Sequence, residues 1–164
     1  MPSYSAPVDD TLFLLNDVLD YDQHSSLRGF ADATPDLVEA ILREGAKFAE
    51  GVVQPLNQSG DEEGCTRSED GSVSTPKGYK EAYTGFSEGG WGGLSADPDF
   101  GGQGLPHVLT TAINEYMSSA NMAFAMYPGL TAGAIAALTL HGSQEQKAKY
   151  LPNMIAGTWT GTMN

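Results

Sequence analysis

Basic residues and cysteine are both scarce in this sequence of 164 residues. Eight Lys and Arg side chains stand against 21 Asp and Glu side chains, which gives a formal net charge of −13. A surface this acidic repels the phosphates of nucleic acids and of anionic lipids, so it argues against both as partners. Cys65 is the only cysteine, which excludes a disulfide within the chain and is typical of a reducing compartment.

The N-terminal segment lacks the marks of a secretory signal peptide. Its first ten residues contain neither a basic start nor an apolar core. We therefore predict a cytoplasmic location.

Charge is absent over one long stretch, from Tyr116 to Gln144, between Glu115 and Glu145. The first 100 residues carry 19 acidic and 6 basic side chains, so they hold the whole net charge (6 − 19 = −13). An uncharged stretch of this length is either buried or lines an apolar ligand site. Polar residues and the Pro128-Gly129 pair interrupt it, which predicts a buried helix pair and no membrane span.

Familiar cofactor and metal motifs are missing as well. The glycines around Trp91 and Phe100 match neither a Walker A nor a GxGxxG pattern, and they follow no predicted strand. Close backbone turns beside large rings explain these glycines better than a phosphate site. The three histidines have no metal-ligand spacing, so we predict no metal site.

The remaining pattern is helical, and it predicts an all-α fold with a strand at the C-terminal end. Thr34-Pro35-Asp36 is a helix start with a capping hydroxyl and an N1 proline. Ser143 and Gln146 have the spacing of a capping box. The expected elements are helices over 11–19, 34–56, 79–89 and from 107, a loop over 57–76, an interruption or restart at 128–129, a helix over 143–151, and a strand from 157.

One candidate site lies inside the uncharged stretch. Its polar and apolar side chains suit the wall of a pocket that accepts a flexible apolar ligand. Ordinary helix–helix packing explains the same residues and is favoured on the residues alone. The set consists of Ser118, Ser119, Asn121, Phe124, Met126 and Tyr127.

Several separated motifs, in the same order, resemble the acyl-CoA dehydrogenase family. They cover essentially the whole chain. Residues 1–13, 60–65 and 75–79 are similar to a long subfamily that includes 3-methylmercaptopropionyl-CoA dehydrogenases. The family motifs themselves are Asp99–Pro106, Asn114–Met122, Gly142–Pro152 and Trp159–Asn164.

The resemblance implies an N-terminal arm over 1–30, the N-terminal helical domain over 31–156, and the start of a flavin-binding β middle domain over 157–164. It implies FAD as cofactor and an acyl-CoA as substrate, which undergoes α,β-dehydrogenation. It also implies an electron-transfer acceptor, contact with the remaining domains of the same protein, and a homo-oligomer.

The resemblance further assigns site residues. Phe124, Ala125, Pro128 and Ala132 would face the acyl chain, and Met163 would contact the flavin. The catalytic glutamate and the flavin motif are expected beyond Asn164, so no catalytic residue is assigned and the chain alone is expected to be inactive. The alternative is a stand-alone helical interaction or acyl-binding module without redox chemistry.

Overall fold

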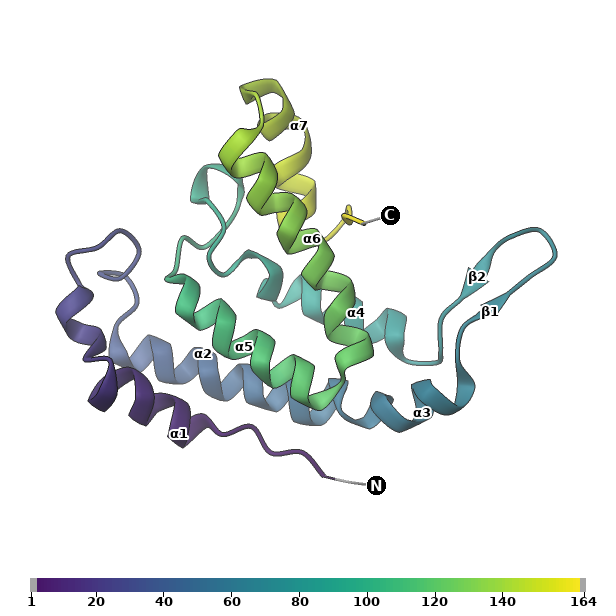
Figure 1. Ribbon diagram of the computed structural model, residues 1–164, viewed down its shortest axis with the longest axis horizontal. Helices are drawn as coiled ribbons and strands as arrows, with labels where there is room; N and C mark the ends of the chain where they lie inside the picture. Colours follow the sequence, from purple (N-terminus) through teal and green to yellow (C-terminus); the bar gives the residue numbers. More distant parts are fainter. Residues whose placement is uncertain (1–2, 163–164) are drawn as a thin grey trace.

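Helices α2 (Pro35–Phe48) and α5 (His107–Ala120) pack side by side at the centre of the fold (Figure 1). Val38 and Leu42 of α2 and Leu109 and Ile113 of α5 are almost fully buried. The computed structural model describes residues 3–162. The other elements are α1 (Val8–Phe13), η1 (Leu14–Val18), η2 (Tyr21–His24), η3 (Ala49–Val53), α3 (Pro55–Glu63), β1 (Thr66–Arg67), β2 (Val73–Ser74), α4 (Tyr79–Glu88), η4 (Trp91–Gly93), η5 (Pro98–Phe100), α6 (Met122–His141) and α7 (Gln144–Ile155).

The N-terminal arm folds back on this centre. Val8 and Leu15 point inward from α1 and the π-helical turn η1, and both are buried. The backbone N–H of Ala6 donates to Glu50 Oε1 at 2.8 Å, next to η3. The predicted short helix near residue 11 therefore exists, and it packs on α2 and on residues of α5.

The predicted start of α2 is confirmed and its predicted end is wrong. Thr34 Oγ1 accepts from the N–H of Leu37 at 3.4 Å, and Pro35 is the first helical residue. The helical path does not stop at Pro55. In the π-helical turn η3, Gln54 N donates to Ala49 O at 2.8 Å, and Pro55 then opens α3 in the position where its missing N–H is not needed.

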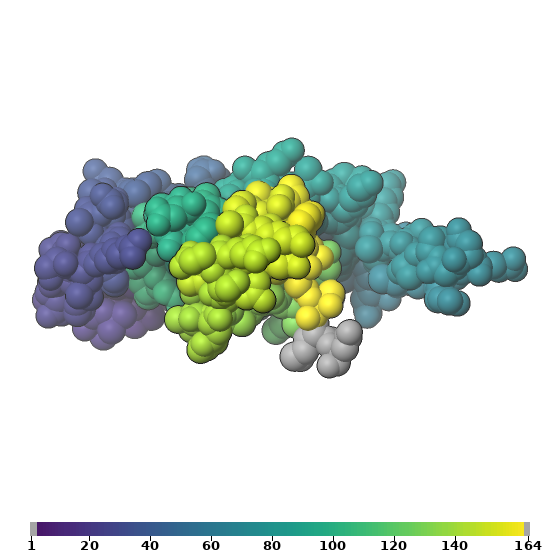
Figure 2. All heavy atoms as spheres, turned by 90° about the horizontal axis from the view of Figure 1, so that it is seen from above, coloured from purple at the N-terminus to yellow at the C-terminus, as the bar shows by residue number. Residues whose placement is uncertain are grey.

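The predicted loop over 57–76 is also wrong, because α3 runs to Glu63 and a short antiparallel hairpin follows. Thr66 pairs with Ser74, and Arg67 pairs with Val73. The Asp70 carboxylate accepts from Ser72 N at 2.9 Å and from Ser72 Oγ at 2.7 Å, and these hydrogen bonds lower the pKa of Asp70. Such local hydrogen bonds order a polar turn that has no apolar period. The hairpin projects away from the helices (Figures 1 and 2).

The break within the uncharged stretch lies at Asn121 and not at Pro128. Helices α4 and α5 begin as expected, but α5 ends at Ala120, and Asn121 is extended with φ −161° and ψ 97°. Helix α6 then continues through Pro128 to His141. Proline removes one backbone hydrogen bond from the helix interior, and α6, which packs against α5 and α7, nevertheless continues past it.

The predicted capping box of α7 is confirmed. Ser143 Oγ accepts from Gln146 N at 3.2 Å, and Gln146 Oε1 accepts from Ser143 N at 2.8 Å. The strand expected from 157 is not formed over residues 157–162. Backbone donors of this segment bond elsewhere: Thr158 N and Trp159 N both donate to Asn153 O. Without a partner strand, the alternating sequence has no ladder to join.

The uncharged stretch divides between core and surface. Its α5 part is buried, as predicted, whereas α6 exposes Met122, Met126 and Leu140, the last by 75%. By length and composition alone, helix α6 is long and apolar enough to cross a membrane, a property shared with core helices of other proteins, and only 11% of its apolar stretch is buried. Figure 2, which is seen from above, shows α7 and the C-terminal part of α6 in front of the other helices.

Candidate functional site

The residues predicted to face an acyl chain form a stripe along α6. Because an α-helix turns by about 100° per residue, Ala125, Pro128 and Ala132 fall within an arc of roughly 60°. Ala125 and Pro128 are half-buried, and Ala132 is exposed. These three side chains would form one wall of a pocket. Phe124, at its N-terminal end, is 4% exposed and closes that end against the core.

Asn121 fixes the start of α6. Its Oδ1 accepts from the N–H of Phe124 at 3.1 Å and caps the helix. Its Nδ2 donates to Tyr79 Oη at 3.0 Å and to Val53 O at 3.4 Å. The Tyr79 hydroxyl in turn donates to Leu56 O at 3.3 Å. Asn121 is 1% exposed, and every one of its side-chain hydrogen-bonding atoms is used.

Aromatic rings surround Phe124 below this polar node. The ring of Phe86 meets it edge-on, with centroids 6.1 Å apart and an interplanar angle of 75°. The ring of Tyr79 lies 6.3 Å away on another side. Edge-to-face contacts of this kind hold a ring in one orientation. Phe124 is thus fixed through its backbone and through its ring.

A groove of about 1680 Å³ also borders Phe124, and Tyr79 is among its lining residues. Ala123 and Tyr127 of α6 line it, together with α4, α3, the base of the hairpin and the turn at 156–158. Ala125, Pro128 and Ala132 do not line it. Of the four predicted acyl contacts, the groove therefore includes Phe124 alone, and the stripe is a separate surface.

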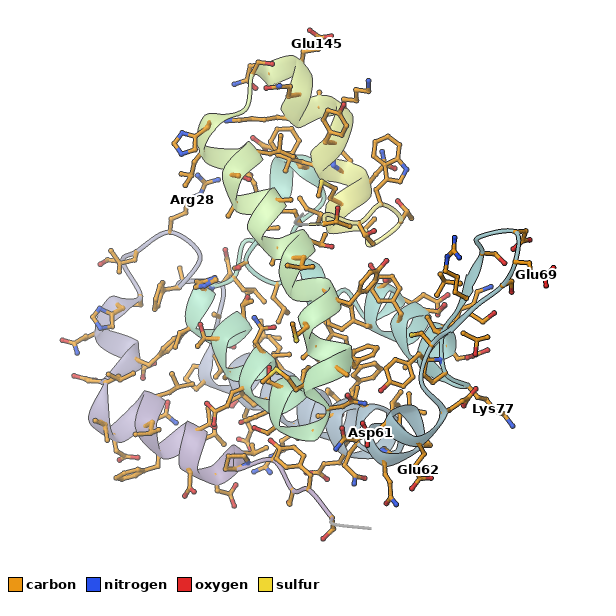
Figure 3. The ribbon with its side chains drawn as sticks, turned by 45° about the vertical axis from the view of Figure 1, so that its right-hand side comes forward. Arg28, Asp61, Glu62, Glu69, Lys77 and Glu145 are labelled. Carbon is orange, nitrogen blue, oxygen red and sulfur yellow. The ribbon has the colours of Figure 1, made fainter. Side chains whose placement is uncertain are left out.

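The groove has an aromatic wall with polar ends. Tyr83 Oη donates to Gly157 O at 3.1 Å, and the Tyr83 and Tyr127 rings are in edge contact at 5.1 Å. Burial raises the pKa of the Tyr83 hydroxyl, so the group stays protonated and remains a donor at neutral pH. Figure 3 labels several charged side chains, and none of them lies on α6: Glu69 is on the hairpin, Asp61 and Glu62 are on α3, and Glu145 is on α7.

Neither a metal centre nor a glycine-loop anion site is evident in residues 3–162. No three His, Cys, Asp or Glu side chains there are grouped to hold a metal ion. In the loop before α5, the N–H groups of Gln103, Gly104 and Leu105 donate to the carbonyls of Gly93, Ala96 and Leu94. These amides hold the loop itself together and are not presented to a ligand.

Sequence reasoning selected Asn121 and Phe124 as part of a pocket wall but missed their connection to Tyr79. Ser119, Met126 and Tyr127 from the same set are exposed. Met163, the predicted flavin contact, lies outside the described residues. The one available signal for Tyr79 was its place at the start of a predicted helix, which says nothing about a partner 42 residues away.

The relatives found by comparison with known proteins agree with one another. Residues 35–158 match the N-terminal domain of acyl-CoA dehydrogenases. The chain is 42% identical over 162 residues to the 3-methylmercaptopropionyl-CoA dehydrogenase of Ruegeria pomeroyi. The aligned region covers 99% of this chain and 27% of that protein. It is 31% identical over 164 residues to a butyryl-CoA dehydrogenase of Syntrophomonas wolfei, with 98% and 27% covered. The chain thus spans about a quarter of the length of these relatives.

A solved structure, described as an electron transferring flavoprotein of Acidaminococcus fermentans, has the same fold. The two structures superpose with a TM-score of 0.60 at 20% sequence identity. The matched region covers 75% of this chain and 30% of the chain of the solved structure. At that identity the likeness concerns the fold alone. The helical architecture, the ordered motifs and the match over residues 35–158 lead to one conclusion: the chain belongs to the acyl-CoA dehydrogenase family, through the N-terminal helical domain of that family.

Proposed function

We propose that this chain is the N-terminal portion of an FAD-dependent acyl-CoA dehydrogenase and supplies one wall of its acyl pocket. The observation that carries the proposal is the α6 stripe of Ala125, Pro128 and Ala132, which bears no charge and is only partly covered. An uncharged wall of small side chains suits an acyl chain, and it needs an opposite wall from another part of the protein.

The chemistry requires groups that these residues do not provide. FAD would supply the hydride acceptor. We place the contacts to FAD at Met163 and in the sequence beyond Asn164, and we place the catalytic base beyond Asn164. The chain's own residues bind and orient: the stripe takes the acyl chain, and Phe124 closes one end. The acidic surface of the first 100 residues leaves the phosphates of coenzyme A to be bound elsewhere in the protein.

The proposed setting has two sources. From the N-terminal segment, which lacks the marks of a signal peptide, we place the protein in the cytoplasm. From the family, we propose a homo-oligomer that passes electrons to a separate acceptor. Residues 157–164 would lead into the β middle domain, and residues 1–30 would be an arm on the helical domain.

The test uses the polypeptide that continues beyond Asn164, purified with its cofactor. We expect yellow flavin absorption and bleaching of that absorption by an acyl-CoA, with reduction of an artificial electron acceptor. Pro128→Glu would place a charge on the stripe and should abolish bleaching, while Ser68→Glu on the hairpin should leave it unchanged. A colourless protein that is indifferent to every acyl-CoA would refute the proposal.

A further inference from the structure

The residue that caps α6, Asn121, is joined to two other helices through a partly buried polar chain. Asn121 Nδ2, Tyr79 Oη and Leu56 O are linked in sequence by hydrogen bonds of 3.0 and 3.3 Å. The chain connects the α5–α6 junction to α4 and then to α3. Asn121 and Tyr79 both contact Phe124, the residue that closes the proposed acyl wall.

Tyr79 is held tightly in this position. A Cβ atom placed on Gly60 of α3 would lie 2.4 Å from the Tyr79 oxygen, so the ring fits only because Gly60 has no side chain. Its hydroxyl accepts from Asn121 and donates to Leu56 O, which uses both of its functions. Asn121 is buried, so a movement that separates it from Tyr79 leaves a buried amide without a partner, and this cost holds the network in one arrangement.

From this geometry we infer that Asn121 and Tyr79 are positioning residues for acyl-chain length. They hold Phe124 still, by its N–H through Asn121 Oδ1 and by its ring through the neighbouring Tyr79 ring. Phe124 stands at the N-terminal end of the stripe, so its position decides where an acyl chain must stop. The inference rests on the proposed function, and it adds two residues that do not themselves touch the substrate.

The chain offers a matched pair of tyrosines for the test. Tyr79 and Tyr83 are one turn apart on α4, and each donates its hydroxyl to one backbone carbonyl. Only Tyr79 bonds to Asn121; Tyr83 bonds to Gly157 O at the other end of the groove. Tyr79→Phe and Tyr83→Phe therefore remove the same atom from the same helix, and only the first interrupts the network.

The experiment measures kcat/KM of the full-length holoenzyme for a series of straight-chain acyl-CoAs, short to medium. In Tyr79→Phe, Phe124 gains freedom to swing aside, so the ratio of the longer to the shorter substrates should rise by roughly tenfold, the lower range for one methylene in an apolar pocket. Asn121→Ser, which keeps a capping oxygen but loses both amide donors, should shift the ratio in the same direction. Tyr83→Phe should leave the ratio at the wild-type value.

The ratio of the two kcat/KM values does not depend on how much of the enzyme is folded, so it can still be measured for a partly unstable variant. An unchanged ratio in Tyr79→Phe and Asn121→Ser, in an enzyme that does oxidise acyl-CoAs, overturns the inference and leaves the proposed function standing. An equal change in Tyr83→Phe overturns it too, because the effect would then be a general loosening of α4. A wild-type protein that oxidises no acyl-CoA refutes the proposed function, and the inference with it.

Discussion

The Tyr116 hydroxyl donates to Thr11 Oγ1 at 2.7 Å and so joins α5 to the N-terminal arm across 105 residues of sequence. Tyr116 is fully buried in the core, and its hydroxyl contacts the arm at Thr11. Thr11 also donates to Pro7 O at 2.9 Å, within the arm itself. The contact makes residues 8–18 part of the folded unit.

Thr11→Val should loosen the arm. The substitution keeps the shape of the side chain but leaves the buried Tyr116 hydroxyl without its acceptor, which costs about 1–3 kcal/mol. Urea unfolding of the 164-residue chain measures the loss. Thr111→Val is the control, because Thr111 bonds only to His107 O on an exposed turn of α5. Equal losses in the two variants would mean that the Tyr116–Thr11 hydrogen bond adds nothing to stability.

Alkaline pH should destabilise the fold. Burial is the main cause that raises the pKa of Tyr116, and the nearby Glu115 carboxylate raises it further. The folded chain then keeps the phenol proton at a pH where the unfolded chain loses it. This stabilisation is complete below about pH 10 and is lost as the pH rises through the pKa of the folded state.

Tyr116→Phe should therefore weaken the dependence of unfolding free energy on pH above about 10. Tyr21 and Tyr83 have pKa values raised by burial as well, so part of the dependence remains. The exposed Tyr150 supplies the control, and Tyr150→Phe should leave the slope alone. A steeper alkaline decline in Tyr116→Phe would contradict the assignment.

Gly129 within α6 and Gly161 beside α6 should respond in opposite ways to alanine. Gly129 has open space around it, so Gly129→Ala should stabilise the 164-residue chain by about 1 kcal/mol through helix propensity. A Cβ on Gly161 would lie 2.8 Å from Ala134 Cβ and 3.2 Å from Leu130 O. Gly161→Ala should lift that segment off α6, break the Gly161 N–Thr131 Oγ1 bond of 3.2 Å and change tryptophan emission near Trp159. Unchanged emission would show that the segment does not rest on α6.

The exposed face of α6 should bind a hydrophobic dye in the isolated chain. Met126 and Val73 are both 62% exposed, but only Met126 has apolar neighbours such as Met122 and Leu130. Met126→Glu should therefore reduce dye fluorescence and aggregation, and Val73→Glu on the hairpin should change neither. If the two substitutions behave alike, the face is no continuous apolar patch.

The sequence by itself determined the elements whose signals are local. The Thr34-Pro35 start and the Ser143–Gln146 capping box are visible because a capping oxygen and its N–H donor lie within four residues of each other. The ordered motifs also identified the family. Local signals failed where contacts with distant residues decide the structure. No pattern near Pro55 shows that a π-helical turn continues the helix. The alternating residues after Gly157 cannot form a strand without a partner strand.

Only the tertiary structure decided how the uncharged stretch is used. Its lack of charge is the same throughout, yet α5 is buried and α6 is largely exposed, because α2 covers one helix and nothing in residues 3–162 covers the outer face of the other. The break at Asn121 has the same origin. Proline has the stronger local signal, but the Asn121 amide finds Tyr79 and Val53 across the fold, and those buried hydrogen bonds decide where α6 begins.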